Sequence, residues 1–548
     1  RKELSFLILY AIAFYIFIIH RSLHISRDHY SKLYGLRPGW LSPHRFNDVS
    51  DAQWRNFRGN LPILTTVFGI FTVVANALRR CFNLKARGMS IVWLFISCVY
   101  LSYLHGACII FILVIASLNF LLVKIFVRTK YFSFVLWIFN TSFLLCNRVY
   151  EGYHFSSFGH RWASLDNFRG TFRWHICFNF VLLRMISFGY DYHWAHQDSH
   201  FDQKKHIQRC YTCKSGRICY QLLQGKSVQN DKFSFCIYLS YLVYAPLYIA
   251  GPIASLNAFA SQLDVPQNNY SVRDIAWYGL RWVLCLSLME LMTHLFYYNA
   301  FAISGLWKHL SPMDIFIIGY GVLNFMWLKF FLIWRYFRFW SLICGIEVPE
   351  NMPRCVNNCY NLESFWKNWH ASFNKWLVRY MYIPLGGSQR KLLNIWVIFT
   401  FVAIWHDLEW KLLSWAWLTC LFFIPEMIVK SAANAFQDLM TKKMIGRGRE
   451  SGGLYLVEDS SSSIPDSFAC SSVGSPLETH CRLGYPSLQS LKRLVPSFSY
   501  LSSLECESYQ FGKHHRVSYP PRVNKRYMNP FEVVHSDIWG PCPIVSKC

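Results

Sequence analysis

Long apolar runs recur along the chain between residues 4 and 429 and carry its main structural signal. A helix that crosses the hydrocarbon core of a bilayer needs about 20 predominantly apolar residues. Runs that reach or approach this length lie near 4–19, 61–78, 90–123, 131–146, 172–190, 233–250, 275–298, 312–334, 393–406 and 411–429. The pattern predicts an all-α polytopic membrane protein with about ten transmembrane or re-entrant helices.

The run 90–123 is longer than one crossing requires. Its midpoint reads Tyr103-Leu104-His105-Gly106, and this polarity and glycine are typical of a short turn. We therefore expect two helices that fold back on one another.

Two of the runs contain ionisable residues: Arg173, His175 and Arg184 in the first, and Arg281, Glu290 and His294 in the second. On insertion scales such a group costs roughly 2.5–3.5 kcal/mol at the centre of a membrane helix, unless it faces protein or water. These helices are therefore expected to line a polar interior. For Arg173 and His175, snorkelling to the interface from a helix end is an open alternative.

The composition agrees with a membrane protein and excludes a disordered one. Hydrophobic residues make up 53% of the chain and charged residues 16%, whereas soluble proteins carry about 25% charged residues. The formal net charge of +25 lies mostly between the apolar runs, which favours anionic lipid headgroups over nucleic acid as the partner. The 19 cysteines are too scattered for a disulfide framework. Because residue 1 is Arg, the start is expected to be truncated.

The chain changes character near residue 445. We expect a membrane domain over 1–445, a Ser-rich flexible linker over 446–478 and a separate polar, basic piece over 479–548. The last piece carries no further apolar run, so it is expected to be a short, mostly irregular appendage.

Residues 363–387 read ESFWKNWHASFNKWLVRYMYIPLGG and show helical periodicity. At 100° per residue, five aromatic residues fall within about 80° of arc: Phe365, Trp369, Phe373, Trp376 and Tyr380. The pattern predicts one aromatic-faced helix that ends at Pro384 and Gly386. His370 would project roughly 60° beyond the edge of the aromatic face.

Lys367, Lys375 and Arg379 occupy much of the remaining circumference of this predicted helix. Cations beside apolar surface could bind an acyl-CoA, whose phosphates need positive charge and whose chain needs an apolar environment. A plain amphipathic helix at the membrane interface explains the same pattern.

His406 ends the apolar run 393–406 and is followed by Asp407 and Glu409. An imidazole with an ordinary pKa near 6.5 can accept a proton at neutral pH, which makes His406 a candidate general base. The segment lacks the second histidine of an H-E-x-x-H zinc helix. As a single histidine it could also be an ordinary interfacial side chain.

The segments 363–387 and 399–413 together resemble the two signature segments of the membrane-bound O-acyltransferase family. The similarity extends to DVSDAQWRNFRGNLPIL at 48–64, to 172–194 and to YLVYAPLYIAGPI at 241–253. These motifs resemble the branch that contains the glycerol uptake protein and hedgehog acyltransferase, and the resemblance covers about residues 1–440.

By this resemblance His406 is the family's membrane-embedded histidine, and His370 stands where relatives carry Asn, Asp or His. The implied activity is acyl transfer from acyl-CoA, as co-substrate, to a hydroxyl of a lipid or protein acceptor at the endoplasmic reticulum membrane. A lysolipid portion of a glycosylphosphatidylinositol anchor is one such acceptor. His406 would act as general base and His370 would orient a reactant or stabilise the oxyanion, with no metal or cofactor required.

Two other classes of function stay open from the residues alone. A small-polyol transporter would also need many spans and polar groups at membrane depth, although no inverted repeat is visible. A catalytically dead membrane interaction protein is the third possibility.

The loop at 206–219 contains His206, Cys210, Cys213 and Cys219. A Cys-x-x-Cys pair with a nearby histidine is a zinc pattern, but this spacing is irregular. Palmitoylated or plain thiols are the favoured interpretation.

Residues 480–541 resemble a different family, the pre-integrase region of Copia-type retrotransposon polyproteins. His480 and Cys506 match its zinc ligands, whereas Tyr485 and Tyr509 replace the other two, so the zinc site is expected to be degenerate. Asp537 resembles the first carboxylate of an integrase core, which the sequence does not continue. A retroelement fragment joined to an acyltransferase is the favoured interpretation, with a nucleic-acid-binding tail as the alternative.

Overall fold

The computed structural model describes residues 2–41, 45–197, 201–441, 448–451, 454–457, 489, 492–493 and 498–499. The chain divides into two compact units, Arg1–Ile445 and Gly446–Cys548. In the second unit, β3 (Gly448–Ser451) pairs antiparallel with β4 (Leu454–Val457). The predicted ligands His480 and Cys506, with Asp537, lie outside the described residues, and the predicted linker at 446–478 stays a prediction.

The first unit is almost entirely helical. Its longer helices are α1 (Lys2–His29), α2 (Ala52–Phe82), α3 (Ala86–His105), α4 (Ile109–Phe126), α5 (Phe132–Val149), α6 (Trp174–His196), α13 (Val272–Leu295), α15 (Pro312–Ile343), α18 (Lys391–His406) and α19 (Trp410–Thr441). The shorter helices are α7 (Gln203–Arg209), α8 (Tyr211–Lys214), α9 (Tyr220–Gly225), α10 (Phe235–Val243), α11 (Ala245–Tyr248), α12 (Leu256–Asp264), α14 (Tyr298–Ser304), α16 (Leu362–Asn368) and α17 (Ala371–Leu377). Two short strands, β1 (Leu36–Pro38) and β2 (Phe46–Asp48), pair antiparallel.

Single 3-10 turns link several of these elements. They are η1 (Tyr30–Lys32), η2 (Phe155–Phe158), η3 (Ala163–Asn167), η4 (Asn230–Phe233), η5 (Leu306–His309), η6 (Val356–Asn358) and η8 (Gly387–Arg390).

Eight of the described helices are long and apolar enough to cross a membrane, which confirms the all-α polytopic fold. They are α1 to α5, α13, α15 and α19. The run 90–123 folds back as predicted: α3 ends at His105, Gly106 adopts a φ of 57°, and α4 begins at Ile109. Of the other predicted runs, α6 is buried on almost every side and α18 has 16 residues.

The apolar run 233–250 does not form one continuous helix. The run breaks at Tyr244 into α10 and α11, where Pro246 lies in the first turn of α11 and has no N–H to continue the preceding helix. The break frees backbone carbonyls in the protein interior. Arg184 of α6 donates to the carbonyls of Leu242 (2.7 Å) and Leu247 (2.6 Å). This arginine therefore faces the protein interior, as the sequence indicated.

Charged residues of the bundle are paired between helices. Arg58 of α2 forms a two-pronged salt bridge with Glu290 of α13, with distances of 2.5 and 2.8 Å. Asp51 caps α2 by accepting from the Trp54 amide (2.6 Å), and it also accepts from the buried Lys329 of α15 (2.8 Å). Because a buried charge is costly without a partner, these pairs fix how α2 meets α13 and α15.

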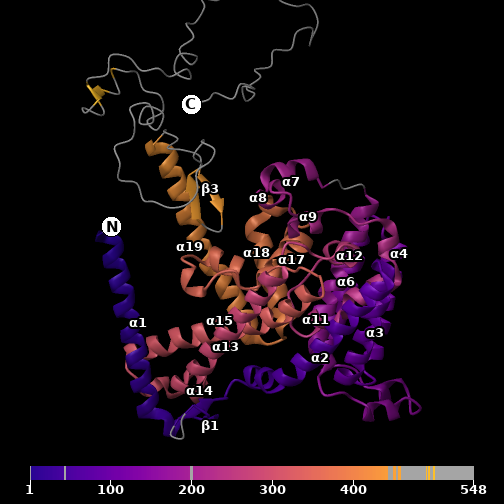
Figure 1. Cartoon of the computed structure of the whole chain (residues 1–548), viewed down its shortest axis with the longest axis horizontal. Coiled ribbons are helices and arrows are strands. Elements are labelled where there is room, and N and C mark those ends of the chain that lie inside the picture. The colour runs from indigo at the N-terminus through magenta and orange to yellow at the C-terminus, as the bar shows by residue number, and fades with distance from the viewer. Residues whose placement is uncertain are drawn as a thin grey trace, which may run out of the picture. The chain divides into compact units, whose positions relative to one another are not determined.

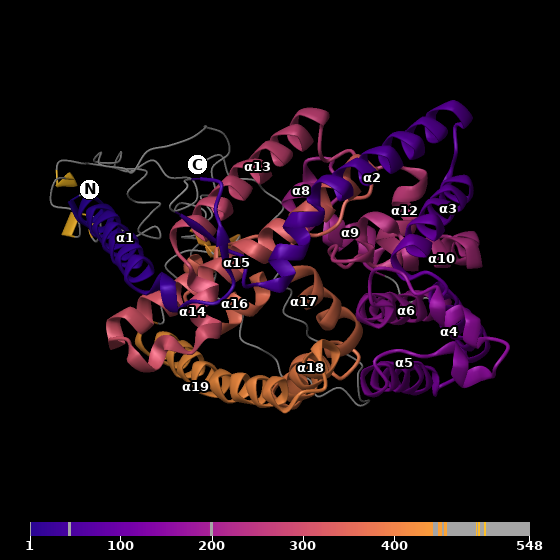
Figure 2. The ribbon, with the colours of Figure 1, turned by 90° about the horizontal axis from the view of Figure 1, so that it is seen from below.

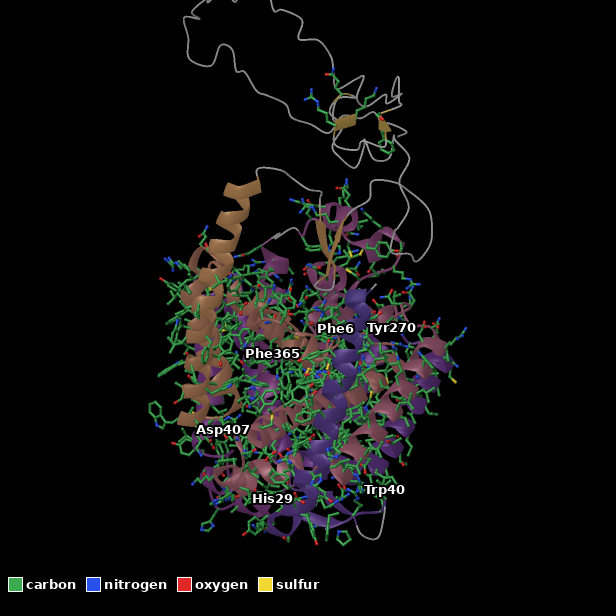
Figure 3. The ribbon with its side chains drawn as sticks, turned by 90° about the vertical axis from the view of Figure 1, so that its left-hand side faces the viewer. Phe6, His29, Trp40, Tyr270, Phe365 and Asp407 are labelled. Carbon is green, nitrogen blue, oxygen red and sulfur yellow. The ribbon has the colours of Figure 1, made fainter. Side chains whose placement is uncertain are left out.

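Figures 1 and 2 show how the first unit is assembled. Seen from below, α16 and α17 lie inside the unit, with α18 and α19 along one side and α2 and α13 along the opposite side (Figure 2). Helices α3 to α6 form one end. In Figure 3, His29 and Trp40 lie at the bottom of the unit, while Phe365 lies higher, beside α19. The segment that contains His370 is therefore enclosed by membrane helices.

Candidate active site

The prediction of a single aromatic-faced helix over 363–387 is wrong. The segment forms α16, α17 and a π-helical turn η7 (Val378–Tyr382), with a break at Trp369 and His370. His370 has a φ of 48°, in the left-handed region that non-glycine residues avoid. Because the helix does not run through, the constant 100° step fails across the break and the predicted aromatic stripe does not exist.

Asn351 stabilises the backbone conformation at this break. Its carbonyl accepts from the Ala371 amide (2.9 Å), and its side-chain oxygen accepts from the Ser372 amide (3.0 Å). The Ser372 hydroxyl in turn accepts from the Ile253 amide (2.8 Å). These contacts satisfy first-turn amides of α17 that have no partner within the helix. They offset a left-handed conformation that costs on the order of 1–2 kcal/mol.

The His370 ring is packed between aromatic side chains and has no hydrogen-bond partner among the described residues. Its ring stacks on Trp334 with centroids 4.4 Å apart and planes 13° apart, and it also contacts Phe373. The residue is 8% exposed, and its buried Nε2 has no hydrogen-bond partner among the described residues. A buried polar atom normally finds a partner, so this nitrogen is available to a ligand.

His406 is the last residue of α18. The Trp405 ring lies close to both His406 and His370. The Trp405 ring is 6.5 Å from the His370 ring and 4.9 Å from the His406 ring, measured between centroids. Both histidines line the same cavity. The structure thus brings together the two residues that the sequence singled out for catalysis.

The end of α18 is anchored by residues that the sequence analysis missed. Arg148 of α5 donates to the carbonyls of Trp405 (2.8 Å) and His406 (2.5 Å). Asn179 of α6 donates to the Trp405 carbonyl (2.7 Å), and the Trp405 indole donates back to the Asn179 carbonyl (3.1 Å). A helix C-terminus leaves carbonyls unpaired and attracts positive charge. Asn179 could have been found as a polar residue within the motif 172–194, whereas nothing in the sequence pointed to Arg148.

The cavity has a volume of about 2100 Å³ and lies among α2, α3, α15, α17, α18 and α19. Its wall is mainly apolar and aromatic, with Val67, Tyr103, Phe330, Ile398 and Trp415 among the lining residues. Polar residues also reach it, including Gln53 and Asn56. Ordinary small-molecule pockets measure roughly 300–1,000 Å³, so this cavity can hold a long apolar ligand with polar ends.

The three predicted acyl-CoA contacts lie in different surroundings. Lys367 lines the cavity and pairs with Glu363 (2.8 Å). Hydrogen bonds from Lys367 and Lys430 lower the pKa of Glu363 to about 2. Lys375 and Arg379 are not among the lining residues. Arg379 instead pairs with the buried Asp191 (3.1 Å). Contact of any of the three with acyl-CoA stays a prediction.

Comparison with known proteins matches the membrane-bound O-acyltransferase family to residues 168–451. The membrane-bound O-acyltransferase Gup1 of Schizosaccharomyces pombe is 35% identical, over 72% of this chain and 68% of its own. Its namesake in Saccharomyces cerevisiae is 33% identical, over 74% and 72%. The chain belongs to the membrane-bound O-acyltransferase family.

This acyltransferase is also similar to the protein-cysteine N-palmitoyltransferase of Mus musculus, with 30% identity over 39% of this chain and 45% of the relative. Membership confirms the predicted class, a multi-pass membrane enzyme that transfers acyl groups. It favours this class over the small-polyol transporter.

A second family, the GAG-pre-integrase domain, matches residues 453–514 of the acyltransferase chain. The predicted retrotransposon fragment is therefore confirmed. The match begins inside the stretch predicted as a linker.

Proposed function

We propose that this acyltransferase moves a fatty acyl group from acyl-CoA to a hydroxyl of a lipid or protein acceptor at the endoplasmic reticulum membrane. The first candidate acceptor is a lysolipid portion of a glycosylphosphatidylinositol anchor. The observation that carries the proposal is that His370 and His406 line one large, mainly apolar cavity.

His406 is the general base of the proposed reaction. Among the described residues no hydrogen bond engages its ring, so a neutral imidazole is free to accept a proton. His406 takes the proton of the acceptor hydroxyl, and the hydroxyl oxygen forms a bond to the thioester carbonyl carbon. The carbon–sulfur bond then breaks, and the proton passes from His406 to the departing CoA thiolate.

His370 orients a reactant or stabilises the developing oxyanion. Its free Nε2 can donate one hydrogen bond when that nitrogen carries the proton. The stacking against Trp334 fixes the plane of the ring. A donor held in place before reaction stabilises transition-state charge more effectively than a mobile one.

A hydroxyl acceptor is supported over an amine by the pattern of relatives. The proteins named O-acyltransferases align over 68% and 72% of their length in the two cases above, whereas the N-palmitoyltransferase aligns over 45%. The apolar wall of the cavity suits the acyl chain, and Lys367 at the same cavity suits the CoA phosphates.

The test is acyl transfer from radiolabelled acyl-CoA in purified membranes that contain the full chain, the His406→Ala variant or the His309→Ala variant. His309 is an exposed histidine that does not line the cavity. We expect a base-labile labelled ester in the lipid fraction for the parent and for His309→Ala, and its loss for His406→Ala. Label confined to a base-stable amide, or equal labelling by all three, would contradict the proposal.

A further inference from the structure

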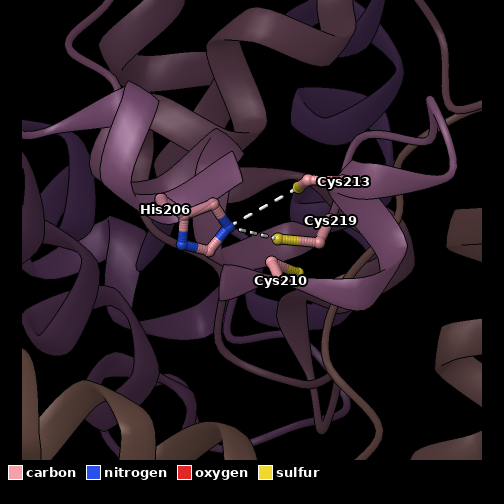
Figure 4. A group of neighbouring side chains, drawn as sticks. All are labelled: His206, Cys210, Cys213 and Cys219. Carbon is pink, nitrogen blue, oxygen red and sulfur yellow. Dashed lines mark hydrogen bonds between the residues drawn. The ribbon is translucent and has the colours of Figure 1, made fainter. Parts of the chain in front are cut away.

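His206, Cys210, Cys213 and Cys219 converge in the loop between α6 and α10 (Figure 4). Their ligand atoms all lie within 4.8 Å of one another. The Nε2 of His206 is 3.1 Å from the sulfur of Cys219 and 3.5 Å from that of Cys213. The fold thus brings the four residues together despite their irregular spacing in the sequence. This geometry favours a metal site over the plain or palmitoylated thiols that the sequence favoured.

Each ligand is positioned by local backbone structure. His206 and Cys210 lie one helical turn apart, since the Cys210 amide donates to the His206 carbonyl (2.9 Å). Helix α8 then presents Cys213, and Gly216, with a φ of 78°, reverses the chain. Cys219 caps α9, where its sulfur accepts from the Leu222 amide (3.3 Å).

We propose that these four residues bind one structural Zn²⁺ ion in a tetrahedral Cys3His site. Zinc–sulfur bonds of about 2.3 Å and zinc–nitrogen bonds of about 2.0–2.1 Å place tetrahedral ligand atoms roughly 3.5–3.8 Å apart. The observed separations require only small side-chain movements to reach that geometry. Four protein ligands leave no open position for a substrate, so the ion is structural.

The surroundings fit the charge of such a site. Three thiolates and a neutral histidine give the zinc complex a net charge of −1. Positive charge is dense in the same segment, which contains Lys204, Lys205, Arg209, Lys214 and Arg217. This positive charge in sequence suits a site with a net charge of −1.

None of the four residues lines the cavity, so the site would stabilise the segment 363–387 from outside it. The Tyr220 hydroxyl, next to Cys219, accepts from the Ser255 amide (3.0 Å) in front of α12. The backbone N–H of Asn257 in α12 donates to Asp191 (3.2 Å), which also accepts from the Tyr380 hydroxyl (3.0 Å). Zinc would therefore fix the position of α9, which is linked to η7 through these hydrogen bonds.

The test is zinc content of the purified full chain, measured by elemental analysis in the parent, in Cys213→Ser/Cys219→Ser and in Cys355→Ser/Cys359→Ser. The second pair is the control, since Cys355 and Cys359 are free, partly buried cysteines outside the cluster. We expect about one zinc ion per chain, lost in the first double variant and kept in the control. A His480→Ala/Cys506→Ser variant should also keep its zinc, which excludes the tail as the source.

A second measurement on the parent protein covers the case in which the cluster variant fails to fold. Removing zinc with a strong chelator should make Cys210, Cys213 and Cys219 reactive to alkylation, while Cys355 and Cys359 keep their reactivity. A parent without zinc, a disulfide within the cluster or a hydroxylamine-sensitive acyl group on these cysteines would overturn the proposal.

Discussion

The guanidinium of Arg148, near the end of α5, donates a 2.5 Å hydrogen bond to the backbone carbonyl of His406, the last residue of α18. The same group donates to the Trp405 carbonyl and lies 3.7 Å from Asp407. The position of the candidate base is therefore fixed through the backbone, by a residue from a distant part of the chain. Among the residues that the structure describes, no hydrogen bond reaches the imidazole itself.

Replacing Arg148 should slow the reaction without weakening acyl-CoA binding. In Arg148→Ala the His406 carbonyl loses its side-chain donor and the Trp405 carbonyl keeps only that of Asn179, so His406 is held less firmly. We expect kcat to fall at least about tenfold, with KM for acyl-CoA near the parent value, while Arg148→Lys recovers part of the rate. Steady-state kinetics in purified membranes measure both constants. A fall in protein stability with unchanged kcat would instead assign Arg148 a purely structural role.

His406→Ala should abolish acyl transfer and leave the fold intact. Loss of a general base costs about 10²–10⁴-fold in rate, and the ring makes no hydrogen bond among the described residues that the fold would miss. The readouts are the initial rate with labelled acyl-CoA and the thermal stability of the purified protein. His309→Ala serves as the control and should match the parent in both. A His406→Ala enzyme with the parent rate would remove His406 from the mechanism.

Three substitutions at His370 separate its backbone role from its side-chain role. His370→Asn should fold and keep part of the activity, because Asn tolerates the left-handed backbone and its amide can still hydrogen-bond. His370→Gly accepts the φ of 48° but has no side chain, so it should be stable and slow. His370→Leu should lose both stability and rate. Thermal unfolding and acyl transfer, measured side by side, check the order; equal rates for Asn and Gly would show that hydrogen bonding is not what this position supplies.

The length of the apolar runs was sufficient to predict the membrane fold, and family motifs singled out His370 and His406, which the structure brings to one cavity. The helix break at His370 was not predictable, because the aromatic pattern continues through it, whereas Pro246 is a local signal for the break at Tyr244 that the run-length argument passed over. Both breaks are stabilised by distant groups, the guanidinium of Arg184 and the side chain of Asn351. The anchoring of His406 by Arg148 was missed for the same reason, since one arginine at the end of an apolar run resembles any interfacial arginine.

Asn351→Ala should destabilise the protein and slow it. Removal of the side-chain oxygen leaves the buried Ser372 amide without its acceptor, which costs about 1–3 kcal/mol. The left-handed turn at His370 loses one of its supports, so the rate should fall as well. Asn357→Ala is the matched control, because the one side-chain hydrogen bond of Asn357 among the described residues is an exposed contact with Asn324 (2.9 Å). Chemical denaturation and acyl transfer give the two readouts, and identical behaviour of the two variants would refute the role of Asn351.

A chain cut after Ser451 should retain full acyltransferase activity. The described residues that line the cavity all fall between Gln53 and Met427, and the family match ends at residue 451. The residues after 451 form most of a separate compact unit, and part of that unit matches an unrelated family. Separate compact units of one chain usually fold and function independently. Acyl transfer by the truncated chain, the full chain and the full chain with His480→Ala/Cys506→Ser should proceed at the same rate in purified membranes. If truncation lowers the rate while the double variant does not, the tail supports the enzyme through residues other than the degenerate ligands. If both changes lower it, the retroelement fragment has become a working part of this acyltransferase.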